Sequence, residues 1–235
     1  KCSIILFFEL YRFMHNKIDK RYDAFLATIL DRSAEKFPKD INVLSWNYDY
    51  EFERAYLNYM SYDKDIHDAY ADMNILHKNN KSGKPLADNF GIIKLNGTIG
   101  FYDESGHLHL GLTAKCKYEY SKRDSFELFD LMKAYVELSR SIDGKYSYSP
   151  AISFAWEEDY GIVKVQDEIK SALKNTSVII VIGYSFPYFN RKIDSEIFSL
   201  FEHYPTTKIY VQDKTNANEL AEIVKELIPF WEHVA

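Results

Sequence analysis

Cysteine, proline, glycine and tryptophan are scarce in this chain of 235 residues, which contains 2 Cys, 6 Pro, 9 Gly and 3 Trp. The two cysteines, Cys2 and Cys116, are too few for a disulfide framework or for a zinc site of four thiolates. We therefore expect a reducing, cytoplasmic setting and no bound zinc or other metal. The chain also lacks an apolar run of about 20 residues, the length that a membrane-spanning helix needs, so a membrane is not expected as a partner.

Basic residues are outnumbered, because 29 Lys and Arg stand against 35 Asp and Glu, which gives a net charge of −6. Proteins whose main function is to neutralise phosphate backbones usually carry a basic surface. Nucleic acid is therefore not expected as a partner. Aromatic residues are abundant instead: 19 Tyr and 16 Phe predict a ring-rich core and some exposed tyrosines.

The first residues contain a short apolar segment, residues 4–8, that must be compared with a signal peptide. Glu9 and Arg12 follow it, and no small-residue cleavage site is present. We interpret the segment as the first turns of a buried helix. Because the chain begins with Lys1 and not with methionine, we expect it to be a piece of a larger gene product.

Apolar residues recur at the spacing of one helix face in four segments, 18–30, 162–173, 193–201 and 220–228. Short apolar runs bounded by turn residues lie between them, at 41–46, 90–95, 151–155, 178–182 and 208–211. Such runs are typical of strands buried on both faces of a parallel sheet. The alternation predicts the α/β fold class, with a Rossmann-like parallel sheet flanked by helices in a single domain over 1–235.

Residues 101–110 alternate around a Gly-containing turn and predict an antiparallel hairpin. A Tyr-rich helix is expected over about 122–141, so that a small insertion of hairpin plus helix covers about 101–150. His107 and His109 lie on one face of the predicted strand. Two interpretations are open for them: a metal-binding or proton-relay pair, or a solvated hairpin face.

Three of the predicted strands end in unusual residues, and ligands of open parallel sheets bind at the carboxyl ends of strands. These residues are Asn47, Tyr48 and Asp49 after the first run, Asn96 and Gly97 after the second, and Gly183, Tyr184 and Ser185 after the fourth.

Each of these groups also has a structural interpretation. Asn47 or Asp49 could cap the helix that follows the strand. Asn96 and Gly97 could form an ordinary turn, and Gly183 could simply end a strand.

Taken together, the order Asn-Tyr-Asp, Lys-Leu-x-Gly and Ile-Gly-Tyr-Ser-Phe resembles the sirtuin-like superfamily. The closer resemblance is to the silent-information-regulator-like domains of bacterial NAD-depleting antiphage defence proteins, and it runs from about residue 41 to residue 211. It implies a Rossmann-like domain that binds NAD between its sheet and a smaller inserted module. Asn47 would lie at the nicotinamide ribose, Asp49 near the carboxamide pocket, and Gly183 and Ser185 along the ribose and phosphates. Asp213 would follow the strand that cradles the adenosine half.

The activity implied by this resemblance is cleavage of NAD into ADP-ribose and nicotinamide. A protein accelerates such a reaction by orienting the ribose, stabilising the charge that develops on it and excluding bulk water. The expected catalytic residues are Asn47, Asp49 and Asn96, which takes the position of the family's His. The expected NAD-binding residues are Asn47, Tyr48, Asp49, Gly97, Gly183, Tyr184, Ser185 and Asp213.

The sequence departs from the family pattern in three places. The four-cysteine zinc module of the deacylating sirtuins is absent, which argues against a protein deacylase. The family's His acts as a base on the ribose hydroxyls, but the amide of Asn96 has no proton equilibrium near neutral pH. The Gly-Ala-Gly loop that cradles the pyrophosphate is absent before Asn47, so the N-terminal part of the fold is expected to be missing.

These departures leave an alternative from another class of function. The chain could be a catalytically degenerate module that mediates protein interaction or senses an ADP-ribose-like nucleotide. A third hypothesis is an unrelated α/β protein whose turns imitate the motifs. Asn190, where many relatives have Asp, is predicted to cap a helix. A homo-oligomer or additional effector and sensor domains are the expected protein partners.

Overall fold

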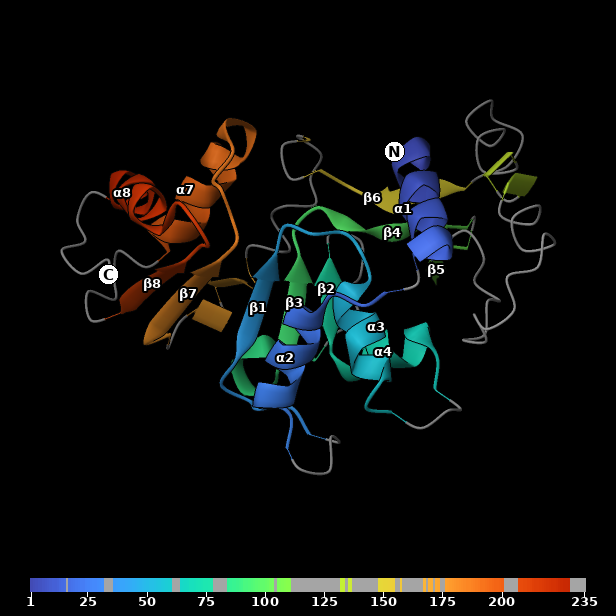
Figure 1. The fold of residues 1–235 in the computed structure, drawn as a ribbon, viewed down its shortest axis with the longest axis horizontal. Coiled ribbons are helices and arrows are strands. Elements are labelled where there is room, and N and C mark those ends of the chain that lie inside the picture. Colours follow the sequence, from blue (N-terminus) through green and yellow to red (C-terminus); the bar gives the residue numbers. More distant parts are fainter. Residues whose placement is uncertain are drawn as a thin grey trace. The chain divides into compact units, whose positions relative to one another are not determined.

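The computed structural model describes residues 1–15, 17–31, 36–60, 64–77, 84–103, 105–110, 148–154, 176–200 and 207–228, with isolated positions between 132 and 173. The fold class is mixed α/β, as predicted (Figure 1). The chain divides into two compact units, which are described separately. Unit 1 comprises Lys1–Lys84 and Asp88–Phe154, and unit 2 comprises Pro85–Ala87 and Ala155–Ala235. The assignment of 1–235 to a single domain stays a prediction.

Unit 1 contains a parallel sheet of three strands, β1 (Asn42–Ser45), β2 (Ile75–His77) and β3 (Gly91–Lys94), in the order β1-β3-β2. Ser45 and His77, the last residues of β1 and β2, both lie opposite Lys94, the last residue of β3. The carboxyl ends of the three strands therefore meet at one edge. β1 and β3 confirm the strands expected at 41–46 and 90–95, whereas β2 was not predicted.

A second sheet of unit 1 is antiparallel and has the order β5-β4-β6, built from β4 (Gly97–Tyr102), β5 (Leu108–Leu110) and β6 (Ser149–Ile152). The pairing of β4 with β5 confirms the predicted hairpin. The prediction that the run 151–155 belongs to the parallel sheet is wrong, because β6 pairs antiparallel with β4. A short apolar run does not encode the direction of its partner. The helix expected over 122–141 lies largely outside the described residues.

The helices of unit 1 are α1 (Cys2–His15), α2 (Lys20–Ile29), α3 (Glu51–Leu57) and α4 (Ile66–Asp72). A short 3-10 turn, η1 (Leu86–Asp88), crosses the point in the sequence where Pro85–Ala87 of unit 2 are followed by Asp88 of unit 1. α1 confirms the helix expected at the start of the chain, and Cys2 and Ile5 on it are buried. Asp19 accepts a hydrogen bond from the backbone N–H of Arg21 and so caps α2.

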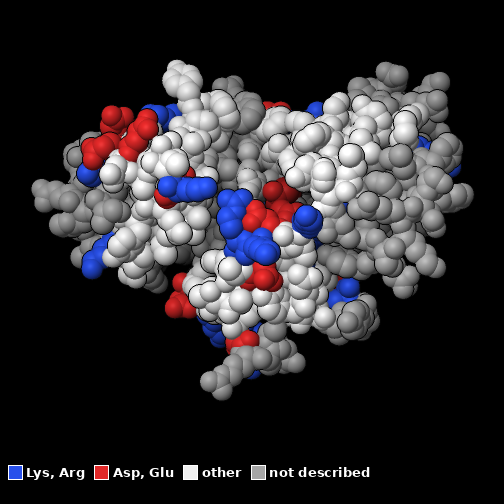
Figure 2. All heavy atoms as spheres, in the orientation of Figure 1, with Lys and Arg blue, Asp and Glu red and all other residues white. Residues whose placement is uncertain are grey.

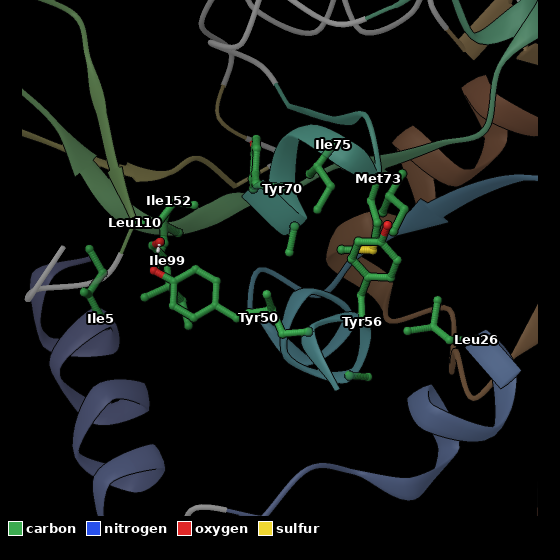
Figure 3. Packing of buried hydrophobic residues seen from close by; sticks show 14 of the residues in the cluster. Ile5, Leu26, Tyr50, Tyr56, Tyr70, Met73, Ile75, Ile99, Leu110 and Ile152 are labelled. Carbon is green, nitrogen blue, oxygen red and sulfur yellow. Dashed lines mark hydrogen bonds between the residues drawn. The ribbon is translucent and has the colours of Figure 1, made fainter. Parts of the chain in front are cut away.

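The core of unit 1 is rich in aromatic residues, as the composition predicts (Figure 3). Tyr50 extends toward Ile99 and donates a hydrogen bond from its hydroxyl to the Ile99 carbonyl. Ile5 of α1 packs in the same cluster. α1, the start of α3 and the antiparallel sheet therefore share one apolar core.

Unit 2 contains the parallel pair β7 (Val178–Ile182) and β8 (Lys208–Gln212), the 3-10 turn η2 (Tyr188–Asn190), and the helices α7 (Arg191–Ser199) and α8 (Ala217–Leu227). These elements confirm the strands and helices expected there. The expectation that β7 is buried on both faces is wrong, because Val178, Ile180 and Ile182 are 45%, 58% and 60% exposed. Burial alternates along this strand, since successive side chains point to opposite faces of the two-stranded sheet. Most of the helix expected over 162–173 lies outside the described residues.

Within the described part of the chain, no helix combines the length and the apolar character that crossing a membrane would require.

Candidate functional site

The loop between β1 and α3 carries the first group of predicted site residues. Its conformation is set by its own side chains: the Asn47 N–H donates to the Ser45 hydroxyl over 3.1 Å, and the Glu51 N–H donates to the Asp49 carboxylate over 3.2 Å. The second bond occupies a free N–H at the start of α3. The capping interpretation of Asp49 is therefore correct. The hydrogen bond uses the oxygen Oδ1, which leaves Oδ2 for other contacts.

The same loop is held from the other side by residues 94–99, which run from the last residue of β3 into the start of β4. Four carbonyl oxygens of the loop and of the end of β1 each accept one hydrogen bond from this segment. The bonds join Leu95 N to Ser45 O (2.8 Å), Asn96 Nδ2 to Trp46 O (2.8 Å), Ile99 N to Tyr48 O (2.8 Å) and Lys94 Nζ to Asp49 O (2.5 Å). We call this set the loop clamp. It fixes the backbone on both sides of Asn47.

The innermost member of the loop clamp, Lys94, is a buried cation. Its side chain is 1% exposed and forms an ion pair of 2.5 Å with Glu53, which is 0% exposed. The second carboxylate oxygen of Glu53 has no hydrogen-bond partner among the described residues. The nearby His77 has a pKa lowered to about 3, because burial and the Lys94 charge both disfavour imidazolium. The Lys94 ammonium and the Glu53 carboxylate therefore each stabilise the charge of the other in the core.

Asn47 and Asp49 line one cavity of about 430 Å³, formed by α1, α2, the loop after β1 and α3. This volume falls within the roughly 300–1,000 Å³ that is usual for small-molecule sites. In Figure 2, acidic and basic side chains lie next to one another in the middle of the face shown. The charged residues that line the cavity are Glu9, Arg12, Lys17, Asp19, Arg21, Asp49, Glu51 and Arg54, and Phe8, Tyr22 and Tyr50 contribute aromatic walls.

Three polar side chains of the cavity, those of Asn47, Tyr22 and Asp49, offer hydrogen-bonding groups to a ligand. The amide of Asn47 donates to the Tyr22 hydroxyl over 2.7 Å. Burial, together with the Asp49 charge, raises the pKa of Tyr22 to about 12, so Tyr22 is a neutral phenol near pH 7. Burial also raises the pKa of Asp49, and the Lys94 ammonium opposes that shift. An amide, a phenol and a carboxyl group therefore offer both donors and acceptors to a hydroxylated ligand.

The remaining predicted residues of unit 1 serve the fold and are not among the residues that line the cavity. The Tyr48 ring packs edge-on against Phe8, with ring centroids 5.4 Å apart. Asn96 is buried and belongs to the loop clamp. Gly97 has φ = +73°, and a Cβ at this position would lie 2.2 Å from the Ala151 carbonyl oxygen. Glycine at this position therefore allows the close approach of the two backbones.

The other predicted residues belong to unit 2 and are described there alone. Gly183 has φ = +60°, and a Cβ at this position would meet no atom of the described residues within 4 Å. The Tyr184 hydroxyl lies 3.0 Å from both carboxylate oxygens of Asp194. Burial raises the pKa of Asp194 to about 7. Ser185 is exposed.

Asp213 and Asn190 lie at the beginnings of helices in unit 2. The Asp213 carboxylate accepts hydrogen bonds from the N–H groups of Thr215 (2.9 Å) and Asn216 (2.8 Å), which form the turn before α8. Asn190 takes the N-cap position of α7, as predicted, but its side chain makes no capping hydrogen bond. Its buried amide oxygen has no partner among the described residues.

The two hairpin histidines contact the turn between β4 and β5. His109 Nε2 lies 2.8 Å from the Asp103 carboxylate, and His107 Nδ1 lies 2.5 Å from the Ser105 hydroxyl. His107 and Ser105 are exposed. Across the described residues, no group of three or more His, Cys, Asp or Glu side chains is placed to hold a metal ion.

Comparison of the chain with protein-family models, with curated proteins and with solved structures gives no match in any of the three.

Two residues of the cavity, Asn47 and Asp49, were predicted from the sequence, whereas the residues that its helices contribute were not. Glu9 and Arg12, like Glu51 and Arg54, are spaced i,i+3 on a helix. That spacing is common for exposed ion pairs, so nothing in it distinguishes a cavity wall from a solvated surface. Tyr22 stood in the apolar stripe of 18–30 and gave no separate signal.

Proposed function

We propose that the cavity of unit 1 binds NAD or an ADP-ribose-like nucleotide, in a domain of the sirtuin-like, Rossmann-like type. The observation that carries the proposal is the common location of Asn47 and Asp49: both line one cavity at the carboxyl end of β1, a strand of a parallel sheet. This is where ligands of open parallel sheets bind. The link to bacterial antiphage defence depends on the sequence resemblance alone.

The residues present are chemically suited to such a ligand. Asn47 and the neutral Tyr22 would bind ribose hydroxyls, and Asp49 would accept from a ribose hydroxyl or a carboxamide. The loop clamp keeps the backbone of Asn47 and Asp49 in place before the ligand arrives, and polar groups that need no reorganisation stabilise developing charge most effectively. When NAD is bound, it supplies nicotinamide as the leaving group at C1′ of the ribose.

The buried amide of Asn96 supports a second candidate function, binding without hydrolysis. Its Nδ2 donates to the Trp46 carbonyl over 2.8 Å, and an amide takes up no proton near neutral pH. A chain with this residue at the family's His position would serve as a sensor of NAD or ADP-ribose, or as an interaction module that has kept the nucleotide site.

Calorimetric titration of NAD and ADP-ribose into the chain, with nicotinamide release measured on the same samples, separates these functions. Binding with release would establish the hydrolase. Binding without release would establish the sensor. No heat with either nucleotide, from a sample shown to be folded by circular dichroism, would contradict both.

Replacing Asn47 with alanine is expected to weaken NAD binding about threefold to tenfold, the loss typical of one hydrogen-bonding group. The measurement is the dissociation constant for NAD. If Asn47→Ala binds NAD as tightly as the unmodified chain, the site lies elsewhere.

Replacing Asn96 with histidine is expected to raise nicotinamide release if the missing base limits the activity. A neutral imidazole could donate from one ring nitrogen to the Trp46 carbonyl while the other accepts a proton. The rate of nicotinamide release is measured at saturating NAD. Asn96→Gln is the control, because it retains an amide donor without a base. Equal rates in the two variants would show that the limitation is not at this position.

A further inference from the structure

The inner wall of the cavity in unit 1 contains a carboxylate close to two arginines. Glu9 on α1 is 3% exposed, and its Oε2 lies 2.6 Å from Nη2 of Arg12. Arg54 on α3 is also close enough to stabilise the ionised form of Glu9. Arg54 pairs with Glu51 over 2.9 Å. All four side chains line the same cavity.

A buried carboxylate in this position is held at a cost. Removing its charge from water is unfavourable, and burial raises the pKa of Glu9 although both arginines oppose the shift. Arg12 contacts Glu9, and Arg54 lines the same cavity while it pairs with Glu51. Two guanidinium groups in one cavity can recognise a phosphate, because each offers several N–H donors in one plane. Lys17 and Arg21 add two exposed basic side chains to the cavity lining, and Arg21 pairs there with the Asp19 carboxylate over 2.6 Å.

We infer that Arg12 and Arg54 form a subsite for a phosphoryl group, and that the Glu9 carboxylate occupies this subsite in the structure described above. A ligand phosphate would displace Glu9 from Arg12 and would compete with Glu51 for Arg54. With Lys17 and Arg21 also in the lining, the ligand class that fits is a diphosphate, such as the pyrophosphate of a nucleotide. The identification of that nucleotide rests on the proposed function, whereas the phosphoryl subsite rests on the two arginines.

The competition between Glu9 and the ligand gives a variant that should gain affinity. Inorganic pyrophosphate is titrated calorimetrically into the full chain at constant ionic strength. Glu9→Gln is expected to bind it about tenfold more tightly, because a like charge at contact distance is removed while the side-chain shape is retained. Arg12→Gln and Arg54→Gln are each expected to bind it about tenfold more weakly. Glu222→Gln is the matched control, since Glu222 forms an exposed i,i+3 pair of 2.8 Å with Lys225 on α8.

Unchanged pyrophosphate affinity in folded Glu9→Gln overturns the inference, and so does unchanged affinity in both arginine variants. If Glu9→Gln fails to fold, the pyrophosphate affinities of the two arginine variants and the thermal midpoint of the unmodified chain test the inference. Pyrophosphate is expected to raise the thermal midpoint of the unmodified chain above that in chloride of equal ionic strength, and an equal midpoint overturns the subsite. Titration with NAD keeps the two proposals apart. If pyrophosphate binds and NAD does not, the phosphoryl subsite is supported and the proposed nucleotide function is contradicted. If NAD binds and none of the three variants changes its affinity, the nucleotide function is supported and the subsite is contradicted.

Discussion

Replacing Lys94 with methionine is expected to lower the free energy of unfolding by about 3–5 kcal/mol, the usual loss when one partner of a buried ion pair is removed. Methionine fills most of the lysine volume but leaves Glu53 in the core without a countercharge. One oxygen of Glu53 already has no hydrogen-bond partner among the described residues. Glu53 must then take up a proton or draw water into the core. Denaturation in urea, followed by circular dichroism, measures the loss.

Two further variants show that the loss comes from burial of the charge. Lys94→Met combined with Glu53→Leu removes both charges, and we expect it to recover much of the stability, because apolar replacements of buried ion pairs are often neutral. Lys225→Met breaks an exposed pair and should cost no more than about 1 kcal/mol. A loss of less than 1 kcal/mol in the Lys94 single variant would contradict the role given to this ion pair.

The same substitution connects the core to the site. Lys94 also donates to the Asp49 carbonyl, so its loss removes one of the four bonds of the loop clamp. The double variant, if it folds stably, should therefore still bind NAD more weakly than the unmodified chain. In the double variant we therefore expect stability to recover while NAD binding stays weak, because only stability depends on removing the uncompensated charge of Glu53.

The sequence was sufficient to predict the elements whose signals are local. α2, α7 and α8 have apolar positions at helical spacing, and α1 contains a short apolar segment. The hairpin of β4 and β5 has its alternation and its turn glycine in one short segment. The pairing of β6 with β4 is determined by contacts between distant segments, so the run 151–155 gave no indication of its sheet. The exposure of β7 was missed for a related reason, since an apolar sequence does not show whether both faces are covered. β2 has three residues, too few for a periodic signal.

The candidate site was predictable only in its strand-end part. Asn47 and Asp49 were found because the carboxyl end of a parallel strand is a position with a general functional meaning. Glu9, Arg12 and Tyr22 come from helices earlier in the chain, and only the tertiary packing brings them to the same cavity. Asn96 was predicted to be a site residue from the family's His position, and its contact with the Trp46 carbonyl could not be predicted from the Asn-Gly dipeptide.

Replacing Gly97 with alanine is the second substitution for which a large effect is expected, a loss of about 3–5 kcal/mol in the free energy of unfolding. The new Cβ would lie 2.2 Å from the Ala151 carbonyl oxygen and 2.9 Å from the Ser153 nitrogen. Both neighbours are backbone atoms, so β4 and β6 would have to move apart. The residue would also keep a left-handed conformation, at φ = +73°, that alanine disfavours.

Gly106→Ala is the control that separates these two causes. Gly106 has φ = +80°, and no atom lies within 4 Å of a Cβ built there, so its substitution carries the conformational cost of about 1–2 kcal/mol without the steric one. Urea unfolding of both variants gives the difference, and equal losses would show that β6 does not approach β4 as closely as described. Displacement of β6 also reaches the site, because the Ser153 N–H donates to the Asn96 carbonyl over 2.9 Å and Asn96 holds the loop after β1. Gly97→Ala is therefore expected to weaken NAD binding at temperatures where it is still folded, whereas Gly106→Ala leaves binding unchanged.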